Sequence, residues 1–379
     1  MPIYKMNGKK DGKQKYNVRV NYIAADGTAK QITRTAYGSE QAKDMERNLT
    51  EKIRAESENP GANMTVQELY NEYIAVKKYE MRESTFDKHK RNYRLYIQPI
   101  MANVRIDEIT TSKLQKWKLS IEEKGLALKT RQNTYGDFRA LLNYAVKMEY
   151  IKKNPLLIIG TFKDALYSKP KMNIYTAQDF KLYIDVAKRQ AEEQQDKYNN
   201  MSEWEYYVFF NIAFYTGLRK GEIHALRWSD LDGSLLHVER SICQKLKGGD
   251  RETPPKNESS IRTLQMPLPL IDVFNAHKER KKLLPCFSGH DRICGAEKSL
   301  RDSSVDKKNR QYAELAGLTR IRIHDFRHSH VSVLANAGIN IQEIARRLGH
   351  TKVEETWNTY SHLYPREEEK AVDILNQIA

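Results

Sequence analysis

The sequence predicts a multidomain α+β protein with three parts. We expect a small basic β-sheet with one helix over residues 1–60, an all-helical domain over residues 64–158, and a mainly helical domain with a small antiparallel sheet over residues 172–379. A length of 379 residues exceeds one ordinary domain. Linker-like stretches with Pro or Gly lie at 58–63 and 168–171. Hydrophobic side chains alternate before the first stretch and recur at helical spacing after it.

The N-terminal part combines a strand pattern with strong positive charge. Apolar or aromatic and polar side chains alternate over Tyr16–Tyr22, which is typical of a half-buried strand. Ala25–Gly27 supplies turn chemistry, Ile32 falls in a second strand, and Ser39 is the predicted N-cap of a helix. Residues 1–38 contain eight Lys or Arg and two Asp. The sheet either lies against DNA or merely keeps the chain in solution. The residues that we expect to contact DNA here are Arg19 and Arg34.

The middle part has the periodicity of a compact helical domain. Val66, Leu69 and Tyr73 recur at helical spacing directly after Thr65. Basic side chains gather on two of the predicted helices, where they either reach DNA phosphates and the major groove or form solvated helix faces. The candidates for DNA binding are Lys88 and Arg91 on one helix and Lys129, Arg131 and Arg139 on another.

The C-terminal part contains one nearly all-apolar helix, Tyr206–Tyr215. A helix of this composition belongs in a core, so Arg219, just beyond the break at Gly217, is expected to be held rigidly. Strand patterns follow at Leu235–Ile242 and Ile261–Met266.

Two arginines, two histidines and a tyrosine form the candidate catalytic set. Guanidinium forks match the non-bridging oxygens of a phosphodiester, which gain negative charge under attack. A tyrosine hydroxyl needs a proton acceptor or a cationic setting before it can attack phosphorus. We expect Arg219 and Arg327 to clamp the phosphate, and His324 to assist Tyr360. His350 would donate a hydrogen bond to the remaining phosphoryl oxygen.

A lysine on a loop would supply the proton for the departing 5′ oxygen, because surrounding positive charge lowers its pKa. Lys245, Lys247 and Lys256 lie between the two predicted strands. Lys256, next to the second strand, is our choice, and Lys247 is the alternative. Tyr364 is the alternative to Tyr360 as nucleophile, although the ten-residue step from the L-G-H motif favours Tyr360.

Composition and motifs also exclude several classes of protein. The formal charge of +15 suggests a polyanionic partner. Since no apolar run approaches a membrane span or a signal peptide, we expect a cytoplasmic protein. Three cysteines without framework spacing suit a reducing compartment. The set Cys286, His290 and Cys294 lacks the fourth ligand and tight spacing of a zinc site, so we expect no metal.

The order and context of these residues resemble the tyrosine recombinase family of phage and transposon integrases. The match covers the C-terminal half motif by motif. The motifs are T-G-L-R-K-G-E around Arg219, P-P-K-N-E-S-S-I-R-T around Lys256, I-H-D-F-R-H-S around His324 and Arg327, L-G-H at His350 and T-Y-S-H at Tyr360. Residues 64–155 resemble the family's core-site-binding domain, and the basic sheet resembles its arm-type DNA-binding domain. Many relatives have Thr-Lys where this chain has Asn257-Glu258.

The resemblance implies a site-specific recombinase of a mobile element that cuts and rejoins DNA through a 3′-phosphotyrosine. Double-stranded DNA with core and arm sites would be its substrate, and four protomers would form a synaptic tetramer on two sites. An excisionase and a DNA-bending host protein are further expected partners. The phosphotyrosyl bond conserves the energy of the broken linkage, so no cofactor, ATP or metal is expected. The alternatives are a Xer-like chromosome-dimer resolvase, a catalytically inactive DNA-binding regulator, and a type IB topoisomerase.

Two acidic residues and one apolar stripe have open roles. Glu222 and Asp325 either orient the arginines and histidines or cap helices. An apolar stripe over residues 371–378 predicts a short terminal helix. That helix docks either on a neighbouring protomer or on its own domain.

Overall fold

The computed structural model describes most of the chain in two compact units. It describes residues 3–23, 28–58, 63–164, 172–244, 249–253, 260–284 and 287–364, together with Val372, Leu375 and Asn376. The units are Met1–Ser168 and Lys169–Ala379. The three-domain division stays a prediction. Several sequence predictions lie outside the described residues: the turn at 25–27, most of both linkers, Lys245, Lys247, Lys256, Cys286 and most of the terminal stripe.

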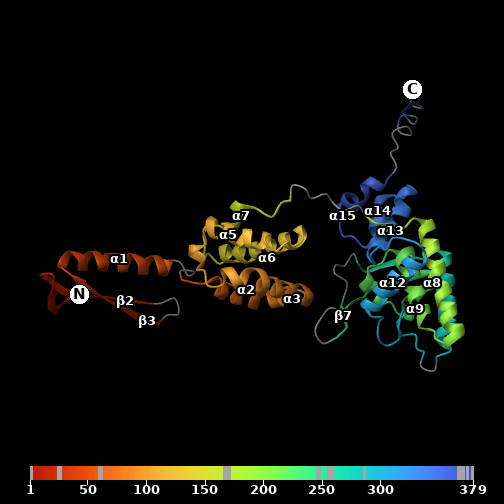
Figure 1. The fold of residues 1–379 in the computed structure, drawn as a ribbon, viewed down its shortest axis with the longest axis horizontal. Coiled ribbons are helices and arrows are strands. Elements are labelled where there is room, and N and C mark those ends of the chain that lie inside the picture. The colour runs from red at the N-terminus through yellow and green to blue at the C-terminus, as the bar shows by residue number, and fades with distance from the viewer. Residues whose placement is uncertain are drawn as a thin grey trace. The chain divides into compact units, whose positions relative to one another are not determined.

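The first unit contains an N-terminal sheet with one helix and a group of helices (Figure 1). Its elements are β1 (Ile3–Lys10), β2 (Lys13–Ile23), β3 (Ala29–Tyr37), α1 (Ser39–Glu58), α2 (Val66–Glu80), α3 (Glu83–Asn92), a π-helical turn (Tyr93–Ile97), α4 (Gln98–Met101), a 3₁₀ turn (Ile106–Glu108), α5 (Thr111–Glu122), α6 (Leu128–Lys147) and α7 (Leu156–Ile159).

The N-terminal sheet is antiparallel with the order β1-β2-β3, and α1 covers one face. Val18 and Ala36 are buried against Ala42 of α1. Strand β1 was not predicted, because its sequence is mostly polar. Its pairing with β2 is interrupted by a register shift. Val18 pairs with Arg34, whereas Arg19 pairs with Thr33. Since successive residues point to opposite faces, Arg34 shares the face of Val18 and Arg19 lies on the other.

The helices α2 to α7 enclose a second hydrophobic cluster. Trp117 and Phe138 are fully buried and meet edge to face, with ring centroids 5.0 Å apart. Thr65, directly before the predicted helical pattern, caps α2 in a capping box with Glu68. Asp137 of α6 accepts a hydrogen bond from Asn92 of α3 at 2.5 Å. This bond ties the two helices that carry the basic candidates.

The second unit is mainly helical, with two small antiparallel sheets. Its elements are α8 (Ala177–Tyr198), α9 (Ser202–Thr216), α10 (Lys220–Ala225), a 3₁₀ turn (Trp228–Asp230), β4 (Leu231–Asp232), β5 (Leu235–Val238), β6 (Ser241–Cys243), β7 (Arg251–Thr253), β8 (Arg262–Gln265), α11 (Leu268–Lys282), α12 (Asp302–Leu315), α13 (Asp325–Asn336), α14 (Ile341–Leu348), α15 (Val353–Tyr360) and a 3₁₀ turn (Ser361–Leu363).

Helix α9 forms the centre of the second unit, as its apolar composition indicates. Phe210 and Phe214 lie in the main hydrophobic cluster, and Phe214 stacks on Phe180 of α8 with centroids 3.8 Å apart. The helix ends at Gly217, whose φ of 64° is left-handed. The Cα of Gly217 faces His330 of α13, since a Cβ added there would lie 2.7 Å from the ring atom Cδ2.

The predicted strand over residues 235–242 is wrong as a single element. The structure breaks it into β5, which pairs with β4 and β8, and β6, which pairs with β7. At the break, the Arg240 side chain bonds to Asp230. Strand β6 packs closely on α10, where a Cβ added to Gly221 would lie 2.7 Å from the Ile242 carbonyl oxygen.

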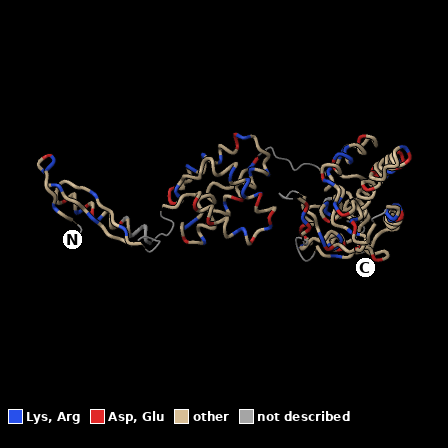
Figure 2. The backbone as a smooth tube through the Cα atoms, turned by 90° about the horizontal axis from the view of Figure 1, so that it is seen from below, with Lys and Arg blue, Asp and Glu red and all other residues tan. Residues whose placement is uncertain are grey.

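Lys and Arg are distributed along the whole chain (Figure 2). None of the helices in the described ranges combines the length and the apolar character of a membrane span.

The close approach at Gly217 generates a stability prediction. Gly217→Ala strains the left-handed backbone and overlaps the His330 ring, so we expect the free energy of unfolding to fall by about 3 kcal/mol. Gly233→Ala is the matched control, because Gly233 has a φ of +57° with open space around it. That control should lose only about 1 kcal/mol. Urea unfolding measures both losses, and equal losses would show that the His330 contact is unimportant.

Candidate active site

Arg327 occupies the centre of the candidate site, between the C-terminal ends of two helices. The side chain is 2% exposed. Nη1 donates to the carbonyl oxygen of Gly217 at 2.8 Å, and Nη2 donates to that of Leu348 at 2.7 Å. Both helices end at a left-handed glycine, which leaves carbonyls without helical partners. The buried guanidinium of Arg327 therefore donates hydrogen bonds to carbonyls that would otherwise have no partner, and these carbonyls stabilise its charge.

Arg219 begins α10 and is oriented by Glu222. Its backbone N–H and its Nη1 each donate to the Glu222 carboxylate at 2.9 Å. Nη2 lies 3.5 Å from the carbonyl oxygen of Gly349. With 39% of its side chain exposed, Arg219 can reach a bound phosphate.

Arg262 of β8 completes the group of guanidiniums. Its Nη2 donates to the Glu222 carboxylate at 3.0 Å, and its Nε donates to the Arg347 carbonyl at 2.7 Å. Burial raises the pKa of Glu222, but Arg262 and Arg219 outweigh burial and hold that pKa below its usual value. Glu222 therefore orients two arginines in addition to capping α10.

His350 is a neutral partner of Arg327 in this arrangement. Arg327 Nη2 donates to His350 Nε2 at 2.9 Å, which assigns the ring proton to Nδ1. Nδ1 then donates to Thr356 Oγ1 of α15 at 2.8 Å. Burial, with a further contribution from Arg327, lowers the pKa of His350 to about 4. Donation from Nε2 to a phosphoryl oxygen, as expected from the sequence, requires a proton that Nε2 lacks here.

Tyr360 ends α15 and is 2% exposed, packed against Val331 and Leu348. Its hydroxyl is hydrogen-bonded to His328 Nδ1, with the two atoms 2.6 Å apart. Burial raises the pKa of Tyr360 to about 12, and the nearby charge of Arg327 acts in the opposite direction. The hydroxyl is therefore protonated at neutral pH and needs a base to become a nucleophile.

His324 lies at the start of α13, beside His328, with ring centroids 5.0 Å apart. Among the described residues, the hydrogen-bond partner of the Tyr360 hydroxyl is His328 rather than His324. Burial and the neighbouring His328 lower the pKa of His324 to about 4. Asp325 accepts hydrogen bonds from the backbone and side chain of Arg322 at 2.9 Å.

The structure places some of the remaining candidate residues, whereas others lie outside the described residues. Lys256 and Lys247 lie outside the described residues, so the choice of general acid stays a prediction. The hydroxyl of Tyr364, the alternative nucleophile, donates to the Ile339 carbonyl at 3.0 Å. In the described part of the chain, no three His, Cys, Asp or Glu side chains are placed to hold a metal ion. Cys294 is fully buried in the core, and Cys286 is not described.

The DNA-binding candidates differ in their accessibility. Arg131 is partly buried, with its guanidinium 3.9 Å from Asp164 and 5.9 Å from the Phe162 ring centroid. Arg19 lies over the Tyr4 ring at 5.2 Å. The exposed candidates are Arg19, Arg34, Lys88, Arg91, Lys129 and Arg139.

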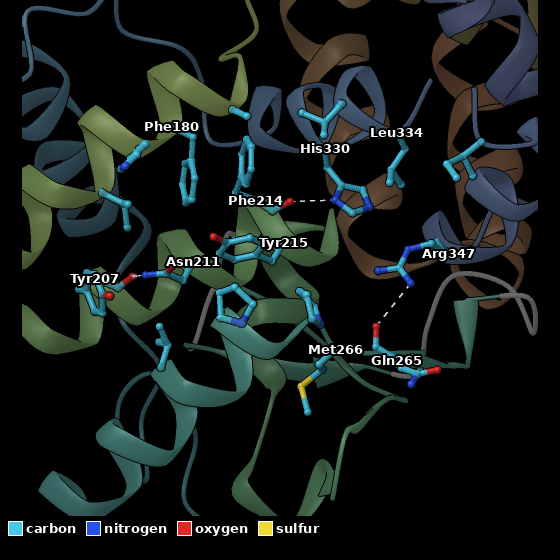
Figure 3. A pocket seen from close by; sticks show the side chains of 18 of the residues that line it. Phe180, Tyr207, Asn211, Phe214, Tyr215, Gln265, Met266, His330, Leu334 and Arg347 are labelled. Carbon is cyan, nitrogen blue, oxygen red and sulfur yellow. Dashed lines mark hydrogen bonds between the residues drawn. The ribbon is translucent and has the colours of Figure 1, made fainter. Parts of the chain in front are cut away.

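A pocket of about 920 Å³ lies on another face of α13 (Figure 3). His330 lines it and is held by a 2.9 Å hydrogen bond between Nδ1 and the Phe214 carbonyl. Leu334 and Met266 give the pocket an apolar lining. Although His330 follows Arg327 by only three residues, it lines this pocket rather than the candidate site around Arg327.

Three residues at the site were not predicted from the sequence: Arg262, His328 and Thr356. Arg262 lies in the motif S-S-I-R-T, and His328 directly follows Arg327. An arginine can bind phosphate and a histidine can accept a proton, so the residue types themselves were the signal that could have identified these two positions. Nothing in the sequence marked Thr356, since the contact of a threonine with a histidine six residues away depends on how α15 folds back.

Comparisons with known proteins agree with the motifs. The model of the Phage integrase family matches residues 168–367, and that of the phage integrase N-terminal SAM-like domain matches residues 65–119. The ICEBs1 integrase of Bacillus subtilis is 27% identical over 382 residues, covering 98% of this chain and 100% of that protein. The transposase of Tn916 from Enterococcus faecalis is 24% identical, covering 80% and 75% respectively.

Solved structures share the fold. The Tn1549 transposon integrase in complex with transposon right end DNA superposes with a TM-score of 0.66 at 22% identity, covering 83% of this chain and 100% of that one. A lambda integrase tetramer bound to a Holliday junction has a TM-score of 0.55 at 14% identity, covering 93% and 96%. The predicted fold class is confirmed.

The buried ion pairs of Glu222 generate a second prediction. Glu222→Gln removes the negative charge between Arg219 and Arg262, so we expect a loss of about 3 kcal/mol in the free energy of unfolding. Glu343→Gln is the control, because the Glu343–Arg346 pair is exposed and should contribute less than about 1 kcal/mol. Urea unfolding at pH 7 compares them; equal losses would contradict a structural role for Glu222.

The buried histidines generate a pH prediction. Burial, with a smaller effect of Arg347, lowers the pKa of His330 to about 3. The unfolded chain binds a proton below about pH 6.5 while folded His330 does not, so stability falls as the pH decreases from about 6.5 towards the folded pKa of about 3. At pH 5 the loss from this group is about 2 kcal/mol. Unfolding at pH 7 and pH 5 should show a smaller difference for His330→Asn than for the exposed control His290→Gln; identical differences would contradict the assignment.

Proposed function

Because the chain belongs to the phage integrase family of tyrosine recombinases, we propose that Tyr360 is the nucleophile with which this site-specific recombinase of a mobile element cuts and rejoins DNA. The observation that carries the proposal is the convergence of three distant motifs on one guanidinium. T-G-L-R supplies Gly217 and L-G-H supplies His350, and both contact Arg327. Arg219 lies at the same helix ends, and Tyr360 packs beside them.

The guanidiniums bind the scissile phosphate. Arg327 is already desolvated and held by carbonyls, so it can stabilise the developing charge without reorganising. Arg219 approaches from the exposed side and its fork matches two phosphoryl oxygens. As negative charge arrives, the pKa of His350 rises from its lowered value, and the ring can then donate to the phosphate.

The reaction exchanges one ester for another. The Tyr360 oxygen bonds to phosphorus, the bond to the 5′ oxygen breaks, and the tyrosine proton passes to a histidine of α13. Lys256, with Lys247 as the alternative, donates a proton to the departing 5′ oxygen. Rejoining reverses these transfers, with a 5′ hydroxyl as the attacking group.

The exposed basic side chains supply the contacts that position DNA. Arg19 of the N-terminal sheet would bind arm sites, and Lys88 with Arg91 on α3 and Lys129 with Arg139 on α6 would bind core sites. Two duplexes and four protomers form the synaptic complex, assisted by an excisionase and a DNA-bending host protein. The cytoplasm, where such DNA lies, is the proposed compartment.

The mobile-element role is favoured over the alternatives by the relatives. An integrase and a transposon transposase match most of the chain, including its N-terminal sheet in the first case. A XerC-like tyrosine recombinase also matches 99% of this chain, so the N-terminal sheet alone does not separate an integrase from a Xer-like resolvase. An inactive regulator would need no buried guanidinium beside a tyrosine.

Trapping the covalent intermediate tests the nucleophile. Nicked DNA carrying an element end is incubated with the protein, denatured and analysed on a gel. Wild type and Tyr364→Phe should give a shifted covalent band, and Tyr360→Phe should reduce it below detection, because phenylalanine has no oxygen to bond to phosphorus. An adduct that survives in Tyr360→Phe would assign the reaction to another residue; no adduct on DNA that the protein binds would favour the regulator.

A further inference from the structure

The hydroxyl of Tyr360 meets a histidine that lies outside the expected catalytic set. His328 Nδ1 and Tyr360 Oη are 2.6 Å apart, and the two ring centroids are separated by 5.4 Å. His328 is on α13, one residue after Arg327, and Tyr360 is the last residue of α15. A neutral acceptor is thus already aligned with the proton that must leave for Tyr360 to attack phosphorus.

The opposite side of the His328 ring faces a carboxylate. His328 Nε2 is 3.9 Å from Asp325 Oδ1, one helical turn earlier. Asp325 is itself fixed by the backbone N–H and the guanidinium of Arg322. A proton on Nε2 is favoured by this carboxylate, which leaves the lone pair of Nδ1 for the tyrosine hydroxyl. At 3.9 Å Asp325 acts on the ring through its charge rather than through a hydrogen bond. The order carboxylate, imidazole, hydroxyl resembles the arrangement that activates a nucleophile in acyl-transfer enzymes.

We propose that His328 is the general base that removes the proton from Tyr360 during DNA cleavage, with Asp325 as its positioning residue. The inference rests on the proposed function of Tyr360. As the Oη–phosphorus bond forms and the phosphorus–O5′ bond breaks, the Tyr360 proton moves to His328 Nδ1. The resulting imidazolium keeps its Nε2 proton towards Asp325. During rejoining His328 returns the proton to the departing Tyr360 oxygen.

The surroundings of His328 suit this role. The titratable and charged groups that face it are Asp325, Arg322, Arg327 and His324 from α13 and its N-terminal approach, and Tyr360 from α15. Burial, despite the opposing effect of Asp325, lowers the pKa of His328, so the ring is neutral and able to accept a proton near pH 7. His324 lies beside it; protein atoms partly desolvate the His324 ring, but the residue is exposed to solvent and accessible to DNA.

Single-turnover cleavage of the nicked substrate tests the proposal. His328→Ala should reduce the rate at pH 7 by about 100-fold or more. The deficit should shrink as the pH is raised towards 10, because the small phenolate fraction of Tyr360, whose pKa is about 12, grows about tenfold per pH unit and reacts without a base. Imidazole in solution should partly restore His328→Ala. His328→Asn places an amide oxygen near Nδ1, which can accept a hydrogen bond but takes up no proton, so this variant should be as slow as His328→Ala.

A sulfur-substituted substrate separates the base from the acid. When the bridging 5′ oxygen is replaced by sulfur, the leaving thiolate needs no proton. If Lys256 is the general acid, the cleavage rate of Lys256→Ala should therefore rise towards the wild-type rate on this substrate. The cleavage rate of His328→Ala should stay low. Band-shift assays and thermal unfolding of each variant establish that DNA binding and folding are retained.

The competing outcomes are distinct. If His328→Asn cleaves at the wild-type rate, His328 is not the general base. If the rate loss in His328→Ala changes with neither pH nor imidazole, His328 contributes only to packing. A pH-dependent, imidazole-restored loss in His324→Ala with unchanged His328 variants would transfer the role to His324. An adduct that persists in Tyr360→Phe refutes the proposed nucleophile instead, and this result is independent of every His328 variant.

Discussion

The site depends on one buried guanidinium that bridges two helix ends. Burying the charge of Arg327 is costly unless hydrogen-bond acceptors surround it, and the carbonyls at the ends of α9 and α14 are unsatisfied without a donor. The carbonyls offset the cost of burying the Arg327 charge, and Arg327 supplies the hydrogen bonds that the carbonyls lack. The two helix ends are therefore held together. Arg219 follows shortly after one end and His350 shortly after the other. The groups that we propose bind the phosphate are consequently held in place by the fold itself.

The electrostatic balance around this bridge keeps the site ready for an anion. Arg219, Arg262 and Arg327 lie near a single buried carboxylate, Glu222. Glu222 prevents the guanidiniums from repelling one another freely, yet leaves an excess of positive charge. His350 stays neutral in that setting because burial and the arginines lower its pKa. A phosphate that enters would supply the missing negative charge and would alter the protonation of the site as it binds.

Local signals in the sequence account for the elements that the structure shares with the predictions. Thr65 and Thr176 cap α2 and α8 through their own side chains, and Gly217 ends an apolar helix in the left-handed conformation, so each needs only neighbouring residues. The polar strand β1 and the break between β5 and β6 depend instead on partners elsewhere in the chain. The alternation of hydrophobic residues along one segment does not show which distant strand that segment pairs with.

The sequence by itself determined the family and the chemical inventory, because arginine, histidine and tyrosine in this order and spacing match the needs of phosphodiester transfer to a tyrosine. Only the tertiary structure decided which members of that inventory meet. His324, His328 and His330 lie within seven residues, yet His328 contacts Tyr360 and His330 lines a separate pocket. A helix turns by about 100° per residue, so these contacts depend on how α13 is rotated against α9, α14 and α15. That rotation is set by packing across the whole core, which no local motif specifies.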